Sequence, residues 1–185
     1  RSAWVLQDAG DPPAAAKACE QPLPLVEETE LRLSILNILT ILYNQLGDMP
    51  RAFQRGEQAL ELAPRSDNPT LRASAVNNLG VIYRAVGETD KALEYFDAAL
   101  EKWQEVGPHP DHARALSNRA EIFLAVGNPK PARRMLERSL RMLDDLGQSG
   151  GRDDAYRLLG VTFSQLWSLS IALVDLYRPL QQYRA

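Results

Sequence analysis

The sequence lacks several features, and each absence excludes a class of site or function. Cys19 is the only cysteine among 185 residues, so no disulfide can form within the chain and no multi-cysteine zinc site is available. Basic residues show no excess, with 21 Lys and Arg against 24 Asp and Glu, which argues against a general nucleic-acid binder. No apolar run approaches the roughly 18 residues of a membrane span, and no signal peptide is visible. We therefore expect a cytoplasmic protein that binds neither membranes nor nucleic acids directly.

Patterns for catalysis and cofactor binding are missing as well. His109 and His112 are close in sequence, yet no further metal ligand accompanies them, and Pro110 and Asp111 favour the start of a helix there. The glycine-rich stretch 147–151 lacks the lysine and the preceding strand of a phosphate-binding loop. A lone Cys19 is more often a small apolar filler than a nucleophile. We expect no enzyme activity, no metal and no cofactor.

What the sequence has instead is a repeat of forty residues. Four sets of similar residues fall in register: Gly47, Gly87 and Gly127; Ala52, Ala92 and Ala132; Leu60, Leu100 and Leu140; and Tyr43, Tyr83, Phe123 and Phe163. A fixed period of this size indicates stacked supersecondary units, each of which buries its apolar face against its neighbours.

Each unit is predicted to be two helices joined by a short turn. Apolar residues recur at three- and four-residue steps up to Val86 and again from Ala92 to Trp103, the pattern of two amphipathic helices. Gly87 between them favours the left-handed conformation that ends a helix, and Thr89-Asp90 is expected to cap the second helix. Three small residues are expected where paired helices cross, because larger side chains would push the helices apart: Gly80, Ala120 and Gly160.

We expect an all-α chain, a right-handed α-solenoid of antiparallel helix pairs. The expected parts are a partial N-terminal repeat and linker in residues 1–30, repeats in 31–70, 71–110 and 111–150, and a degenerate repeat or cap in 151–185. Short helices are expected at residues 4–9 and 14–20 of the first part. Because the chain begins with Arg1-Ser2 rather than methionine, we expect it to be a fragment of a larger protein.

The C-terminal part departs from the pattern. Trp167 replaces the turn glycine, so the helix either runs on or turns near Ser168 or Ser170. The stretch from Leu166 to Tyr177 is apolar, although the end of an array normally needs a polar cap. We expect this stretch to fold back onto its own repeat, with a homodimer through the C-terminal helix as the alternative. Fold-back would pack Tyr177 and Leu180 on Tyr156 and Phe163.

The repeated columns resemble the tetratricopeptide repeat. The resemblance rests on Leu79-Gly80-x-x-Tyr83 followed by Gly87, Ala92, Phe96 and Ala99, and the same columns return over residues 31–147. The forty-residue spacing resembles the extended variety found in kinesin light chain, in cell-polarity adaptors and in arrays of bacterial regulators. Three positions depart from the family pattern: Gly56, Arg119 and Ser139.

The resemblance implies that the first helix of each pair lines a concave groove that binds a protein or an extended peptide. Eight residues outside the apolar stripes are the candidate groove residues: Asn37, Asn77, Asn78, Arg84, Arg114, Asn118, Glu121 and Arg157. Asparagine is a poor helix former, and its amide can pair with both groups of a peptide backbone. Alternatively, the amides tie neighbouring helices together. We expect Asn78 and Asn118 to be replaceable together by alanine without loss of folding.

The predicted function is therefore that of a protein- or peptide-binding scaffold. One alternative is a sensory or autoinhibitory segment of a multidomain bacterial regulator, which shares the fold and differs in its flanking domains. The other is a self-association module built on the C-terminal helix.

Overall fold

The computed structural model describes the backbone of residues 11–182 and the side chains of residues 11–171. Every regular element within them is helical, which confirms the all-α class. The elements are α2 (Pro12–Glu20), η1 (Leu23–Leu25), α3 (Thr29–Gln45), α4 (Met49–Leu62), η2 (Ala63–Arg65), α5 (Pro69–Ala85), α6 (Thr89–Val106), α7 (Pro110–Ala125), α8 (Pro129–Asp145) and α9 (Arg152–Gln182). They form two units, Arg1–Gly107 and Pro108–Ala185. The helix expected at 4–9 lies outside the described residues, whereas that expected at 14–20 is most of α2.

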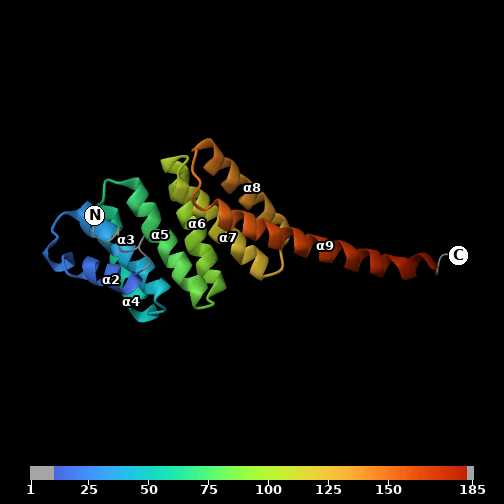
Figure 1. The fold of residues 1–185 in the computed structure, drawn as a ribbon, viewed down its shortest axis with the longest axis horizontal. Coiled ribbons are helices and arrows are strands. Elements are labelled where there is room, and N and C mark those ends of the chain that lie inside the picture. Colours follow the sequence, from blue (N-terminus) through green and yellow to red (C-terminus); the bar gives the residue numbers. More distant parts are fainter. Residues whose placement is uncertain (1–10, 183–185) are drawn as a thin grey trace. The chain divides into compact units, whose positions relative to one another are not determined.

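Successive helices form packed pairs, α3 with α4 and α5 with α6 in the first unit and α7 with α8 in the second (Figure 1). The turn glycines that separate them are left-handed as predicted, with φ of 72° at Gly47, 83° at Gly87 and 72° at Gly127. At the end of α5, Gly87 N donates to Arg84 O at 3.0 Å and Glu88 N donates to Tyr83 O at 2.9 Å. These two bonds satisfy carbonyls that the helix end would otherwise leave unpaired.

The helix starts agree with the sequence only in part. Pro110 is the first residue of α7, and His109 accepts a hydrogen bond from the backbone of Asp111 at 3.1 Å, so the helix-start interpretation of this segment is confirmed. The capping prediction for Thr89-Asp90 is wrong, because Thr89 is already helical and Glu88 precedes it without a side-chain cap bond.

In the first unit, small and aromatic residues fit together where helices cross. A Cβ at Gly80 would lie 2.8 Å from the ring of Phe96, so α5 and α6 meet at the crossing that the sequence predicted. The ring of Tyr83 lies between two others, 5.1 Å from Phe53 and 5.2 Å from Tyr95. A Cβ at Gly56 would lie 2.8 Å from Leu79, which explains why a large residue is absent at that position of α4.

A partly buried ion pair ties α2 to the first full pair. The guanidinium of Arg55 donates to both carboxylate oxygens of Glu20, at 3.0 and 2.9 Å, a bidentate geometry that makes the pair stronger than a single contact. The Tyr43 hydroxyl donates to the same carboxylate at 2.8 Å. Burial, and then the bond to Glu20, raises the pKa of Tyr43 above its ordinary value. One carboxylate therefore joins α2, α3 and α4.

The second unit accommodates the other two departures from the family pattern. Ser139 is fully buried, donates to Ala113 O at 2.7 Å and lies 3.0 Å from the hydroxyl of Ser117, so its polar group is paired within the core. Arg119 is half-buried and lies with its guanidinium 5.0 Å from the centroid of the Phe123 ring. Its aliphatic stem and planar head thus take the space of a core leucine.

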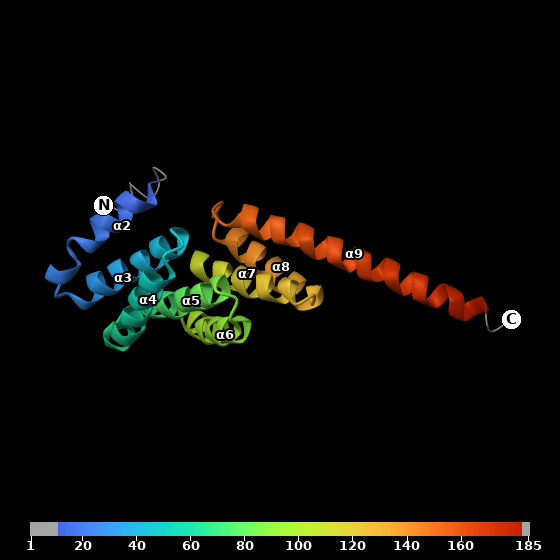
Figure 2. The same ribbon diagram turned by 90° about the horizontal axis from the view of Figure 1, so that it is seen from below.

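The last helix does not fold back. Helix α9 runs for 31 residues without a turn, and Figure 2 shows it extending past the ends of α7 and α8. Ser168 and Ser170 donate within the helix, to Ser164 O at 3.0 Å and to Leu166 O at 2.9 Å, rather than capping a returning helix. The fold-back prediction is wrong because Trp167 replaces the glycine that ends the other first helices. Gly160, expected at a helix crossing, is exposed.

Candidate binding surfaces

The predicted asparagines of the first unit lie inside the fold rather than on its surface. Asn37, Asn77 and Asn78 are only 6%, 3% and 5% exposed. The side chain of Asn37 on α3 donates to Leu71 O on α5 at 3.1 Å, and Asn78 donates back to the Asn37 carbonyl and amide oxygens at 3.4 Å. These bonds tie two neighbouring first helices together, and they correct the expectation that the amides are exposed and replaceable without loss of folding.

We expect Asn78→Ala to lower the free energy of unfolding by about 1–3 kcal/mol, because it leaves the buried amide oxygen of Asn37 without a donor. The two 3.4 Å bonds are long, which favours the lower end of that range. Asn118→Ala is the matched control, since Asn118 is half-exposed and its loss should cost about 0.5 kcal/mol or less. Urea denaturation of both variants makes the comparison, and equal losses would contradict the role assigned to the buried amides.

The remaining candidate residues are more accessible. Arg84, Asn118 and Glu121 are half-buried, and Arg114 and Arg157 are exposed. Arg114 pairs with Asp111 at 2.7 Å, and Arg157 lies 3.6 Å from Asp154, in each case one turn away on the same helix. Exposed pairs of this kind contribute little to stability, so both arginines can exchange their partner for a ligand at small cost.

Apolar side chains lie among these polar ones on the first helices. Six half-buried residues of α3 and α5 combine polar and apolar side chains: Ser34, Ile41, Asn44, Ser74, Val81 and Arg84. The same mixture of partly accessible apolar and polar groups is typical of surfaces that bind proteins.

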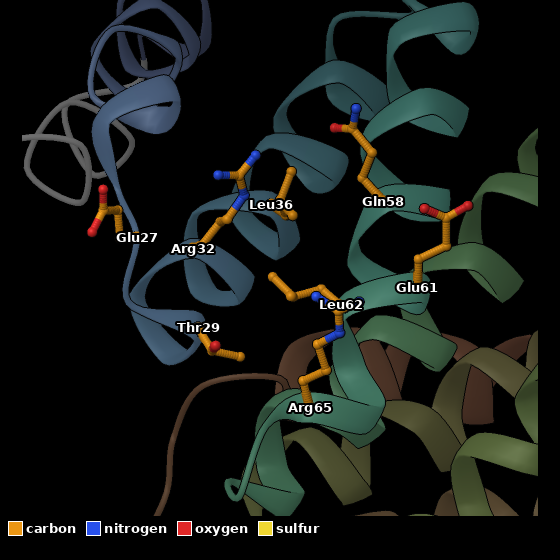
Figure 3. A pocket seen from close by; sticks show the side chains of 8 residues that line it. All are labelled: Glu27, Thr29, Arg32, Leu36, Gln58, Glu61, Leu62 and Arg65. Carbon is orange, nitrogen blue, oxygen red and sulfur yellow. The ribbon is translucent and has the colours of Figure 1, made fainter.

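A hollow of about 470 Å³ opens beside α3 and α4 in the first unit (Figure 3). Its lining is charged and balanced in sign: Glu27, Thr29, Arg32, Leu36, Gln58, Glu61, Leu62 and Arg65. Arg32 donates to Val26 O at 3.3 Å, which holds it along the segment that precedes α3. Sequence reasoning missed this hollow because its residues come from two separate segments, 27–36 and 58–65, and share no motif.

A second hollow, of about 530 Å³, lies on α9 in the second unit and is mostly apolar. Its lining residues are Arg133, Phe163, Ser164, Leu166, Trp167 and Ser170. Phe163 is 51% exposed and Trp167 is 71% exposed. The sequence of this end is apolar, and among the described residues only the guanidinium of Arg133, 5.4 Å from the Phe163 ring centroid, lies over one of the two rings.

The described residues hold no arrangement for metal binding. No group of three or more His, Cys, Asp or Glu side chains in this part of the chain could hold an ion. Cys19 is buried, and burial followed by the charge of Glu20 raises the pKa of its thiol, which makes it a poor nucleophile. Across the described residues, no helix combines the length and hydropathy needed to cross a bilayer.

Comparison with known families supplies the identity of the repeat. Residues 71–145, from α5 to α8, match the model of the tetratricopeptide repeat family. This part of the chain carries tetratricopeptide repeats. Among curated proteins, none matches the sequence significantly.

Several solved structures share the fold at low sequence identity. BtubC (BKLC) from P. vanneervenii is 22% identical with a TM-score of 0.71, over 98% of this chain and 78% of that chain. A kinesin light chain-like protein of Podosopora anserina with nearly identical TPR-like repeats is 19% identical with a TM-score of 0.67, over 99% of this chain and 93% of its own. A signal transduction ATPase with numerous domains from Pyrococcus horikoshii, with a tetratricopeptide repeat sensor, is 19% identical with a TM-score of 0.73, over 89% of this chain and 25% of its own.

Proposed function

We propose that the chain is a protein-binding scaffold in which each unit presents its first helices to a ligand, α3 and α5 in one unit and α7 and α9 in the other. The observation that carries the proposal is the tetratricopeptide fold of residues 71–145, because arrays of this kind present extended surfaces to other proteins. The half-buried mixture of polar and apolar side chains on α3 and α5 supports it further.

The residues assigned to the ligand differ between the two units. In the first unit Arg84 and its half-buried neighbours Ser74 and Val81 would contact the ligand, while the hydrogen bonds of Asn37 and Asn78 hold the helices that present them. In the second unit Arg114, Asn118, Glu121 and Arg157 would contact it. Besides the Ser74 hydroxyl, the polar groups left for the ligand are one amide, one carboxylate and three guanidinium groups, and an extended peptide would suit them because its backbone and side chains offer both donors and acceptors.

The test is a selection of binding peptides from a displayed random library, followed by affinity measurement with variants. Val81→Glu on α5 and Arg114→Glu on α7 should each weaken a selected peptide by about tenfold, which corresponds to about 1.4 kcal/mol. Arg134→Glu on α8 is the control with the same charge change on an exposed second-helix site, and its affinity should be unchanged. Peptides that bind both groove variants normally but lose affinity for Arg134→Glu would move the site to the second helices.

A second candidate function is that of a sensor segment in a larger regulator. Its support is the likeness in fold to the Pyrococcus horikoshii ATPase, whose tetratricopeptide repeats are a sensor. The sequence that flanks residues 1–185 in the parent protein decides between the two, since a sensor requires an output domain on the same chain. The bacterial origin and cytoplasmic location expected from the sequence stay predictions.

A further inference from the structure

One face of α9 carries an uncovered apolar stripe. Tyr156, Phe163, Trp167 and Ile171 are 57%, 51%, 71% and 47% exposed. They follow one another at steps of seven, four and four residues, so they lie on the same side of the helix. Contiguous apolar patches of this kind mark surfaces that bind another molecule or another copy. The other side of α9 is already used, because Ala155, Leu158 and Leu159 are buried in the core of the second unit.

On α5, the face that corresponds to the apolar stripe of α9 is covered by a second helix. A Cβ at Gly80 would lie 2.8 Å from Phe96 of α6, whereas a Cβ at Gly160, eighty residues later, would meet nothing within 4 Å. Tyr83 is held between Phe53 and Tyr95, from the preceding and the following second helix. Phe163 is the counterpart of Tyr83, and Arg133 stands eighty residues after Phe53. The Arg133 guanidinium lies 5.4 Å from the centroid of the Phe163 ring, yet that ring is still half-exposed. The missing element is therefore the second helix of the pair.

The sequence of that missing helix is present in α9 itself. Ala172, Leu176 and Leu180 stand forty residues after Ala132, Leu136 and Leu140 of α8 and eighty after Ala92, Phe96 and Leu100 of α6. Helix α9 has 31 residues, where α5 has 17 and α7 has 16. It thus joins a first and a second helix without the turn that separates them elsewhere.

A single straight helix cannot bring these two halves together. Residues 160 and 176 correspond to Gly80 and Phe96, which touch, yet at 1.5 Å per residue they are about 24 Å apart along α9. Fold-back would need a left-handed residue near position 167, and Leu166, Trp167 and Ser168 adopt that conformation only at a cost in free energy. The second half of α9 can fill the empty position only on another copy of the chain.

We propose that two copies of the chain exchange the second halves of their α9 helices. Each C-terminal half takes the second-helix position on the other copy's first half, so the two α9 helices lie antiparallel. Because residue 160 of one copy would meet residue 176 of the other, the symmetry axis passes near residue 168. The same contacts then occur twice, as a two-fold dimer requires. The occupant of the uncovered face is a second copy of this chain.

The first test compares a variant that restores a turn in the middle of α9 with a variant that keeps the helix continuous. The variant Trp167→Gly with Ser168→Asn recreates the Gly127-Asn128 turn of the preceding pair, and the variant Trp167→Ala with Ser168→Ala removes the same side chains but keeps a helix former. Light scattering should show the natural chain and the alanine variant as dimers, at twice the 20.6 kDa mass of one chain, and the glycine variant as a monomer. A monomeric natural chain, or dimers of equal stability in both variants, would overturn the proposal.

The second test separates exchange from any other self-association. In a Cys19→Ser background, Gly160→Cys and Leu176→Cys place two thiols at positions that correspond to a direct contact in the α5–α6 pair. Exchange predicts disulfides between two chains, seen as a dimer band on a non-reducing gel. A disulfide within one chain would show fold-back, and no disulfide at all would show that the face is not covered by the second half of α9; either result overturns the exchange.

Discussion

Phe96→Ala should lower the free energy of unfolding by about 3–5 kcal/mol, the range for emptying a fully buried aromatic site. Phe96 has no exposed surface, and its ring fills the space against Gly80 on α5. Since small domains have a total stability of about 5–15 kcal/mol, the loss takes a large share of it. Chemical denaturation followed by circular dichroism measures the effect.

The control for this substitution is Arg134→Ala on α8, where the side chain is exposed. It should change the free energy of unfolding by about 0.5 kcal/mol or less. Comparable losses in the two variants would mean that the buried and exposed faces of the second helices are assigned incorrectly.

Gly80→Leu is expected to be the other strongly destabilising change, at about 1–3 kcal/mol or more, because the added side chain would force α5 away from α6. Even a single added carbon would lie 2.8 Å from the Phe96 ring. Val81→Leu, one residue further along the same helix, changes side-chain volume at a half-buried position and serves as the control. Thermal unfolding of the two variants should separate them clearly, and a Gly80→Leu protein as stable as Val81→Leu would show that the crossing tolerates a wider spacing.

The repeat made the helices and their order predictable, because the turn glycines and the apolar stripes determine structure through residues that are close in sequence. Gly47, Gly87 and Gly127 all take positive φ, as the need for a left-handed residue at the end of each first helix requires. The absence of a glycine at position 167 predicts that the helix continues past the position where the other first helices end. The fold-back prediction rests on Ser168 or Ser170 as a cap for a returning helix, and the apolar sequence that follows cannot distinguish a partner within the chain from one outside it.

The binding surface was harder to predict. Helical spacing shows on which side of its helix a residue lies, but not whether a neighbouring helix buries it. Asn37 and Asn78 lie outside their own apolar stripes, yet the neighbouring first helix covers them and accepts their hydrogen bonds. Burial by a neighbouring repeat is a tertiary effect that the pattern of one helix does not contain. The hollow beside α3 and α4 illustrates the same limit, because its charged lining is assembled from segments that no single motif connects.

The short turns between paired helices also bear on how the chain folds. Only three residues separate α3 from α4 and α5 from α6, so the packing within a pair joins residues that are close along the sequence. Contacts of this kind need little loop closure and speed up folding. A newly synthesised helix pair can therefore assemble as soon as its second helix is complete. In α9 no glycine turn separates the two halves, so they cannot pack against each other in this way.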